Sequence, residues 1–331
     1  MKHIAIEEYG LYLGITGEHL QISKKGDVVK EIPLHKIKTI SLSKNGASLS
    51  TNLLLDCCMR GIKVYLHDFK NEIVGGIYGM HEHAVSQIRR NQFKATDNSE
   101  IPYQISKRFI YGKIRNQRAV LLYFDKYLNK TLPSSSEKIQ KAAESIKNSA
   151  EAIKRLSEEP SIDWNFQIMG NEGFSSKIYW LALRESGLLP SSFQSRTGRG
   201  ASDIVNSMLN FGYAVLETII WNAVTNAGLE PYVGFLHVQR PGKPSLVLDI
   251  MEEYRPWVVD RNVIKLSKSD HSQFTPELKK QLIENIHKTI ANKYFYKGKK
   301  VKLESIIQRQ VYKLCAHLYN KKEYQPYLFK W

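Results

Sequence analysis

A histidine and three acids near residue 250 are the first candidates for catalytic chemistry. The stretch GFLHVQRPGKPSLVLDIMEEYRP places His237 before a Pro- and Gly-rich turn, and then Asp249, Glu252 and Glu253 among apolar residues. In a helix these three acids, spaced i, i+3 and i+4, share one face. A helix that is otherwise apolar is largely buried, and unpartnered carboxylates on it cost several kcal/mol. The acids are therefore expected to be neutralised, paired with cations or bound to a metal ion.

Two alternatives explain the acids without catalysis. Asp249 falls near the start of the expected helix, where an acid stabilises the helix by about 0.3 to 1 kcal/mol. Glu252 or Glu253 can form a buried ion pair with Arg255 or Arg261. The histidine shifts the balance only modestly, because a single histidine beside an apolar run is more often an ordinary buried residue. This segment alone leaves both the metal site and the ion pairs open.

A second segment upstream adds another acid. In FQIMGNEGFSSKIYW, Glu172 lies at the start of a helix expected over Gly173–Glu185, and by itself it is a helix-start acid and nothing more. In the next helix, ASDIVNSMLNFGYAVLE, Asp203 is expected to be the N-cap. Asn210 and Tyr213 are polar groups among core-type residues of that helix, and they are candidates to support a site.

Together these segments resemble the Cas1 family of CRISPR-associated adaptation integrases and endonucleases. The resemblance rests on Glu172 with YW seven residues later, on SDIVNSMLNFGYAVL and on GFLHVQRPGKPSLVLDIMEEYRPWVVDR. It extends to IYGKIRNQRAVL and to the N-terminal segment with GIKVYLHD, and so covers nearly the whole chain. It implies that Glu172, His237 and Glu252 hold a divalent metal ion and that Asp249 is a supporting acid or a ligand of a second ion. All four are then catalytic residues.

This chain departs from the family pattern in two places. The last ligand of the family is often Asp and here is Glu252, which keeps the carboxylate and lengthens its reach by one methylene. The segment TGRGASDIVN lacks the prolines that are common there in the family, so the geometry of this loop is not carried over.

Two carboxylates and one imidazole suit Mn²⁺ or Mg²⁺, whereas zinc prefers more His or Cys ligands. Such an ion can polarise a phosphodiester and lower the pKa of a bound water or a DNA 3′-hydroxyl. The resemblance implies transesterification, in which a 3′-hydroxyl of a short prespacer duplex attacks a phosphodiester at the boundary of a CRISPR repeat and inserts a new spacer. Hydrolysis of DNA would use the same chemistry with water. The resemblance also implies a homodimer formed through the N-terminal domain and assembly with the small protein Cas2.

The charge of the chain favours a polyanionic partner. The formal net charge is +16, from 48 Lys and Arg against 32 Asp and Glu, and nucleic acid is the expected partner. The loop SFQSRTGRGASD carries Arg196 and Arg199, which are candidates for DNA contacts, although solvated loop charge explains them equally well. The run YFYKGKKVKLE, from Tyr294, interleaves basic and aromatic residues and is compatible with backbone binding or with an exposed turn.

The elements that position these residues indicate an α+β protein of two domains. Residues 1–79 show short β-rich runs separated by tight turns and are expected to form an antiparallel, β-sandwich-like domain. The resemblance implies that this domain dimerises. Residues 80–331 show helical spacing and are expected to form an all-α catalytic domain that binds metal and DNA. The expected long helices are Lys107–Leu128, Glu137–Leu156, Gly173–Glu185, Ile204–Asn226, Pro276–Tyr294 and Leu303–Tyr319.

Several classes of protein are disfavoured. The N-terminus lacks the order of a secretory signal, and no apolar run approaches the roughly 20 residues that span a bilayer, so a cytoplasmic protein without a membrane partner is expected. Three cysteines give neither a disulfide framework nor a zinc motif. Two alternatives stay open. One is a metal-dependent nuclease of DNA repair or mobile DNA, and the other is a non-catalytic basic DNA-binding scaffold whose acids pair with Arg255 and Arg261.

Overall fold

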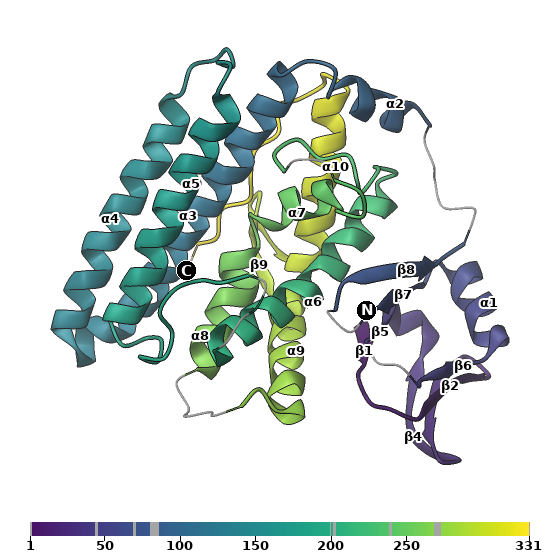
Figure 1. The fold of residues 1–331 in the computed structure, drawn as a ribbon. Helices are drawn as coiled ribbons and strands as arrows, with labels where there is room; N and C mark the ends of the chain where they lie inside the picture. The colour runs from purple at the N-terminus through teal and green to yellow at the C-terminus, as the bar shows by residue number, and fades with distance from the viewer. Residues whose placement is uncertain are drawn as a thin grey trace. The chain divides into compact units, whose positions relative to one another are not determined.

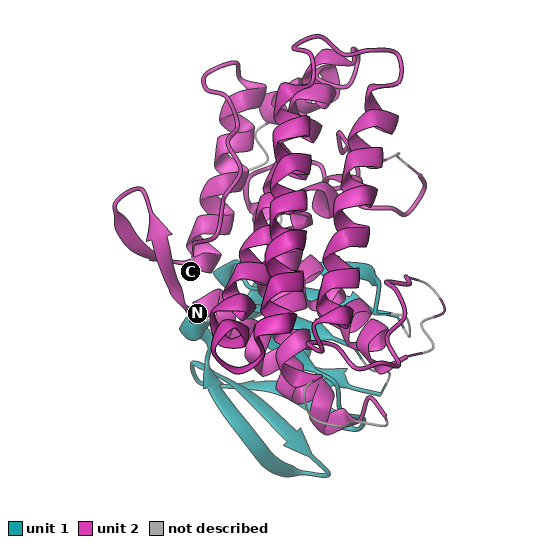
Figure 2. Ribbon diagram, turned by 90° about the vertical axis from the view of Figure 1, so that its left-hand side faces the viewer, with its two compact units in different colours: residues 1–84 teal, residues 85–331 magenta. Residues whose placement is uncertain are grey.

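The computed structural model describes residues 2–43, 46–68, 71–79, 86–198, 200, 203–237, 240–267 and 273–330. The chain divides into two compact units, residues 1–84 and residues 85–331, which Figure 2 colours separately. The first unit is rich in strands and the second in helices (Figure 1), so the expected α+β class is confirmed. The expected boundary after residue 79 adjoins residues 80–85, which lie outside the described residues.

The described residues of the first unit form two four-stranded sheets. One sheet has the strand order β1-β5-β7-β8 and the other has the order β4-β3-β2-β6. Apolar residues of both sheets form one core, with Leu13, Leu20, Ile40 and Val64 fully buried. The bounds are β1 Lys2–Ile6, β2 Leu11–Thr16, β3 His19–Lys24, β4 Asp27–Pro33, η1 Leu34–Lys36, β5 Ile37–Leu42, β6 Ser48–Leu49, α1 Thr51–Arg60, β7 Lys63–His67 and β8 Ile73–Ile77.

The strand pairing in this unit is mixed, whereas the sequence pattern led us to expect antiparallel sheets. β1 pairs with β5 and β5 with β7 in parallel, and β2 also pairs with β6 in parallel. The reason is the connection between β5 and β7, which runs through helix α1, because a helical crossover returns the chain in the same direction. Helix α1 has a cap at both ends. The Ser50 hydroxyl accepts from the N–H of Leu53, and Gly61 ends the helix with φ 68°.

The second unit is a helical assembly with one β-hairpin. Helices α3, α4 and α5 lie side by side (Figure 1), and α6 is packed between α7, α9, α10 and the π-helix η2. No helix among the described residues is long and apolar enough to cross a membrane. The bounds are α2 Ser86–Lys94, α3 Glu100–Thr131, α4 Pro133–Arg155, α5 Trp164–Glu185, α6 Ile204–Asn226, α7 Ser245–Met251, η2 Arg255–Asp260, α8 Arg261–Leu266, α9 Pro276–Ala291, β9 Lys293–Tyr296, β10 Lys299–Lys302 and α10 Leu303–Leu318.

The structure corrects three expectations for this unit. Helix α5 begins at Trp164, so Glu172 lies in its interior and not at its start. The helix expected to carry Asp249, Glu252 and Glu253 stops at Met251, and Pro256 lies in the first turn of η2. Proline is tolerated there because the first N–H groups of a helix have no intrahelical partner. The hairpin β9–β10 also means that the unit is not purely helical.

Candidate active site

Asp249 holds the segment before α7 in place. Its side chain is fully buried. Oδ2 accepts from the backbone N–H groups of Phe235 and Leu236 at 2.6 and 3.0 Å, and Oδ1 accepts from the N–H of His237 at 3.0 Å. The same Oδ1 lies 2.6 Å from Nδ1 of His237. One buried carboxylate therefore fixes both the backbone and the ring of the histidine.

Gly234 permits this close approach. A Cβ at this position would lie 2.6 Å from Oδ2 of Asp249 and 2.8 Å from the backbone N of Leu246, which no side chain tolerates. The N–H of Gly234 donates to the Ser245 hydroxyl at 3.0 Å, and that hydroxyl donates to the carbonyl of Tyr232 at 2.5 Å. The loop and the first residue of α7 are thus joined by side-chain as well as backbone groups.

The contact with Asp249 determines which ring nitrogen of His237 can bind a cation. When Nδ1–H donates to the carboxylate, Nε2 is the unprotonated nitrogen with a free lone pair. Nε2 lies 3.9 Å from Oε1 of Glu252, so this lone pair is on the side of the ring that faces Glu252. The His237 side chain is 20% exposed, and the ring is therefore open to a ligand from solvent.

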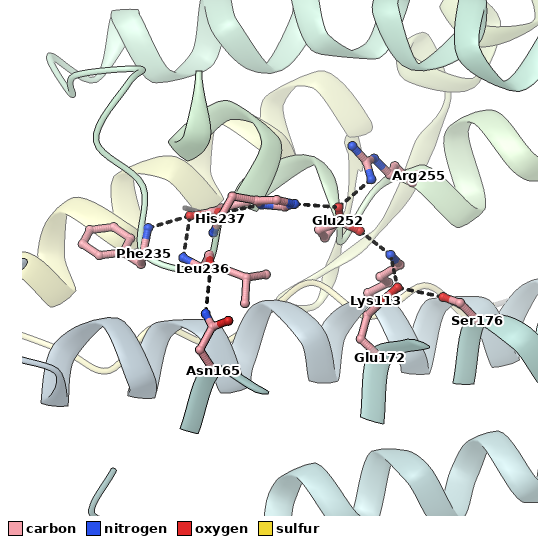
Figure 3. Close-up of polar contacts among 10 residues, drawn as sticks. Lys113, Asn165, Glu172, Ser176, Phe235, Leu236, His237, Glu252 and Arg255 are labelled. Atoms are coloured by element: carbon pink, nitrogen blue, oxygen red, sulfur yellow. Dashed lines mark hydrogen bonds and ion pairs between the residues drawn. The ribbon is translucent and has the colours of Figure 1, made fainter. Parts of the chain in front are cut away.

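Glu172 and Glu252 are joined through Lys113 of α3. Nζ of Lys113 lies 2.5 Å from Oε1 of Glu172 and 2.5 Å from Oε2 of Glu252 (Figure 3). The hydroxyl of Ser176, one turn along α5, donates to Oε1 of Glu172 at 2.8 Å. Both carboxylates thus point at one small volume, and in this structure an ammonium group is the positive charge between them.

Glu252 is buried and ionised. Burial by itself raises the pKa of its carboxyl group, but the positive charges of Arg255 and Lys113 outweigh burial and hold that pKa at about 2. Nη1 of Arg255 lies 2.5 Å from Oε1 of Glu252. Burial lowers the pKa of Lys113, but Glu252 and Glu172 together raise it above its usual value. Glu252, Lys113 and Arg255 are therefore in their charged forms.

This set of side chains fits a divalent metal ion in its chemistry. Among the described residues no three His, Cys, Asp or Glu side chains are grouped closely enough to form a ready metal cluster. However, the buried Oε2 of Glu252 is paired with the ammonium of Lys113, so a positive charge already lies where a metal ion would be held. Two carboxylates and a free imidazole nitrogen around that oxygen are hard ligands of the kind that Mg²⁺ and Mn²⁺ accept. The predicted ligand roles of Glu172, His237 and Glu252 stay predictions.

Glu253 points away from this site. The expectation that it shares a face with Asp249 and Glu252 is wrong, because α7 ends before residue 252 and the three acids diverge. Glu253 accepts a hydrogen bond from the Tyr324 hydroxyl and, at 3.0 Å, one from the N–H of Tyr327. Burial raises its pKa to about 7. Among the described residues it forms no ion pair, so the expected structural pairing with an arginine is replaced by hydrogen bonds to the C-terminal segment.

The two arginines considered as partners of the acids have different roles. Arg255 pairs with Glu252, as one alternative predicted. Arg261 instead donates to the carbonyl of Trp257 at 3.2 Å, and its guanidinium lies over the rings of Tyr123 and Trp257. Of the two arginines, Arg255 therefore neutralises negative charge in the candidate site, and Arg261 does not.

A cleft of about 550 Å³ opens beside Glu172. Its lining includes the acids Glu172 and Asp260 and a larger set of cations, namely Lys113, Lys177, Arg184, Arg196 and Arg255. This excess of positive charge, next to the two carboxylates, suits a ligand that carries phosphate groups.

Arg196 is positioned by side chains from helix α6. Its Nη1 donates to Asn206 Oδ1 at 3.1 Å and its Nη2 to Asn210 Oδ1 at 2.7 Å, and its guanidinium stacks over Tyr213. Asp203 caps this helix by accepting from the N–H of Asn206 at 2.9 Å, as expected. The predicted DNA contact by Arg196 stays a prediction. Arg199, the other predicted contact, lies outside the described residues.

The sequence analysis missed two charged residues of this region. Lys113 was quoted only as part of a motif, although a lysine among the apolar residues of a long helix is a signal of a buried cation that needs acidic partners. Asp260 accepts from the Tyr213 hydroxyl at 2.6 Å. Burial raises the pKa of Asp260 to about 6. Its place in VVDR, after three apolar residues, gives the same kind of signal.

The chain matches known proteins of one class, the CRISPR-associated proteins. The family model described as "CRISPR associated protein Cas1" matches residues 4–295, and the chain belongs to this family, as the motifs predicted. It is 45% identical over 334 residues to "CRISPR-associated endonuclease Cas1 1" of Francisella tularensis subsp. novicida (strain U112), and the match covers 100% of both chains.

Solved structures agree with the fold. The chain matches a casposase bound to its integration product with a TM-score of 0.81 and 22% identity, over 100% of this chain and 95% of that one. It also matches a Cas6-RT-Cas1–Cas2 complex with a TM-score of 0.75 and 17% identity, over 99% of this chain and 36% of that one. At such identities these likenesses show the fold alone.

Proposed function

We propose that the protein is a CRISPR adaptation integrase and endonuclease that cuts and joins DNA with the help of a divalent metal ion. Membership of the Cas1 family and 45% identity to a protein named as an endonuclease support this function. The observation that carries it is the arrangement around Glu252, where Nε2 of His237 faces one oxygen and the other oxygen shares Lys113 with Glu172.

Each side chain has a defined part in this proposal. Glu172, His237 and Glu252 would hold the metal ion, and Asp249 fixes the orientation of His237 and, through Nδ1, its tautomer. A divalent ion at this place polarises a phosphodiester and lowers the pKa of the attacking 3′-hydroxyl or water. Arg255 keeps Glu252 ionised, and the cations of the neighbouring cleft neutralise the phosphates of the DNA. Mn²⁺ and Mg²⁺ both suit the ligands.

The substrates follow from the family. We propose that the 3′-hydroxyl of a short prespacer duplex attacks a phosphodiester at the boundary of a CRISPR repeat, so that the DNA strand is joined while the attacked bond is broken. The protein would assemble with Cas2, since a matched structure contains Cas1 and Cas2 in one complex. A homodimer is what the resemblance to the family implies.

A joining assay tests the proposal. The protein and its Cas2 partner are incubated with a short duplex that has free 3′ ends and a supercoiled plasmid that bears a repeat, in Mn²⁺ or Mg²⁺. The expected products are covalent joint molecules that start at the repeat boundary. They should disappear with His237→Ala and persist with Glu137→Ala, which removes an exposed acid of α4 that pairs with Lys141.

The assay also separates the alternatives. Absence of joint molecules, or joining that survives His237→Ala, contradicts the integrase. Cleavage of branched DNA without joining at the repeat would favour a repair or mobile-element nuclease. DNA binding without either reaction would favour the non-catalytic scaffold.

A further inference from the structure

The hairpin β9–β10 concentrates positive charge on a rigid element of the second unit. Its two strands pair antiparallel, from Lys293 opposite Lys302 to Tyr296 opposite Lys299. The turn residues Lys297 and Gly298 both have positive φ, 47° and 80°, as in the tight turns that match the twist of a hairpin. Figure 2 shows this strand pair extending away from the helices. The hairpin contains five lysines and no acid: Lys293, Lys297, Lys299, Lys300 and Lys302.

One face of the hairpin is anchored to the helical unit. The ring of Tyr294 lies 6.4 Å from that of Trp257 and 5.6 Å from that of Phe329, and Tyr296 is buried with its ring 6.1 Å from that of Tyr327. The Tyr327 hydroxyl donates to the carbonyl of residue 295 at 3.2 Å. The hairpin is therefore held by its aromatic inner face, and its outer face has a fixed direction.

The outer face carries three lysines and one aromatic ring. Side chains alternate along a strand, so Lys293 and Phe295 of β9 share this face with Lys302 and Lys300, which lie directly opposite them. The Phe295 side chain is 61% exposed, and the three lysines are exposed as well. Among the described residues none of these lysines forms an ion pair. We call these four residues the lysine face.

The residues of the lysine face are unfavourable for the stability of the fold. Like charges directly opposite each other on a sheet are destabilising, and Lys293 faces Lys302 in this way. An exposed phenylalanine next to them gains nothing from burial. Both features become favourable when a polyanion with flat apolar rings covers the face. Single-stranded DNA has this chemistry, since its phosphates pair with lysine and its unpaired bases stack on aromatic rings.

We propose that the lysine face binds a single-stranded stretch of DNA, with the ammonium groups at successive phosphates and Phe295 stacked on a base. Lys300 and Lys302 are two residues apart on one strand, about 7 Å, so they can engage separate phosphates. Duplex DNA fits less well, because its bases are stacked on each other and have no free face for Phe295. This inference rests on the proposed function in so far as DNA is the substrate.

Binding of labelled DNA to the full-length protein tests the charge on this face. Fluorescence anisotropy is measured with a single strand of about 20 nucleotides and with the matching duplex, over a range of salt concentrations. With Lys300→Gln/Lys302→Gln, the slope of log affinity against log salt for the single strand should fall in magnitude by about 1.4, since each phosphate contact contributes about 0.7. The control Lys141→Gln/Lys147→Gln removes the same charge from lysines of α4 that pair with Glu137 and Glu144.

Substitutions of Phe295 test the stacking. Phe295→Leu should weaken binding of the single strand about 5- to 150-fold, as loss of a base stacked on an aromatic ring does, and should leave duplex binding unchanged. Phe295→Trp should retain the affinity. Because the ring is exposed, circular dichroism and thermal unfolding of both variants should match those of the unchanged protein.

Three results would overturn the inference. The first is a salt slope for Lys300→Gln/Lys302→Gln equal to that of the control pair. The second is an equal effect of Phe295→Leu on the single strand and on the duplex. The third is a Lys300→Gln/Lys302→Gln variant that loses binding to an acidic peptide but keeps its binding to DNA. The proposed function is tested separately. Normal joining of DNA together with unchanged binding by the lysine-face variants would refute only this inference, whereas single-strand binding without joining would refute only the function.

Discussion

Oδ1 of Asp249 lies 2.6 Å from Nδ1 of His237 and accepts the backbone N–H of the same histidine at 3.0 Å. One oxygen thus sets both where the ring is and which nitrogen it presents to Glu252. The other oxygen of Asp249 holds the two residues before the histidine. The loop and the ring therefore depend on a single buried charge.

Replacing Asp249 should weaken metal binding by more than a loss of folding stability explains. In Asp249→Asn the amide N–H₂ group meets backbone donors, and the ring of His237 is free to take the other tautomer. Partners of this kind typically change metal affinity or activity 10- to 100-fold. The apparent affinity for Mn²⁺ in the joining assay should fall by this factor. The control Asp56→Asn breaks an exposed pair with Arg60 and should change nothing.

An unchanged Mn²⁺ dependence in Asp249→Asn would contradict this role of Asp249. A loss of unfolding stability without a change in metal dependence would leave the residue a purely structural one.

Removing Lys113 should make the stability of the fold depend on a divalent ion. In Lys113→Met the carboxylates of Glu172 and Glu252 lose their shared cation, and breaking a buried pair costs roughly 3 to 5 kcal/mol. Without metal, the melting temperature should fall. Added Mn²⁺ should raise it more in the variant than in the unchanged protein, since the ion then supplies the missing charge.

Lys147→Met is the matched control for Lys113, because it removes an exposed pair with Glu144 that is worth less than about 1 kcal/mol. Equal responses of the melting temperature to Mn²⁺ in Lys113→Met and in the unchanged protein would show that the ion does not bind between these two carboxylates.

The C-terminal segment should stabilise the residues around Glu253. Tyr324→Phe removes the hydroxyl that donates to the buried Glu253 carboxyl group, and an unsatisfied buried acceptor costs about 1 to 3 kcal/mol. Urea unfolding should show a loss of this size. Tyr312→Phe, on the exposed side of α10, should cost less than about 0.5 kcal/mol. Equal midpoints for the two variants would contradict the role given to Tyr324.

Asp260 should make the protein less stable as the pH rises through about 4 to 6. Burial raises its pKa from 3.8 to about 6, so in this window the folded protein binds more protons than the unfolded chain, and stability falls with pH. Asp260→Asn should remove this dependence. In urea unfolding, the free energy of unfolding of the variant minus that of the unchanged protein should increase by about 3 kcal/mol from pH 3.5 to pH 7. If the free energies of unfolding of the two proteins differ by the same amount at every pH in this range, burial does not raise the pKa of Asp260.

Local signals in the sequence predicted the elements better than the site. The bounds of α6 and its Asp203 cap depend on neighbouring residues, and the structure has them as predicted. The partners of Glu172, in contrast, do not depend on residues that neighbour it in the sequence. Lys113 lies 59 residues before it, and no periodicity connects positions on two different helices. Glu252 and Glu253 contact different partners, Lys113 and Tyr327, which lie far along the chain and which no local signal indicates.

Helix α3 carries Lys113 toward the two glutamates and, almost one turn later, Asn116, whose side-chain amide donates to the carbonyls of Glu253 and Tyr327 at 2.7 and 2.9 Å. Each added residue rotates a helix by about 100°, so an insertion between these two positions would turn one of them away from its partners. The number of residues between Lys113 and Asn116 is therefore constrained, as well as the residue types at these two positions. Insertions and deletions in homologous chains should fall outside it.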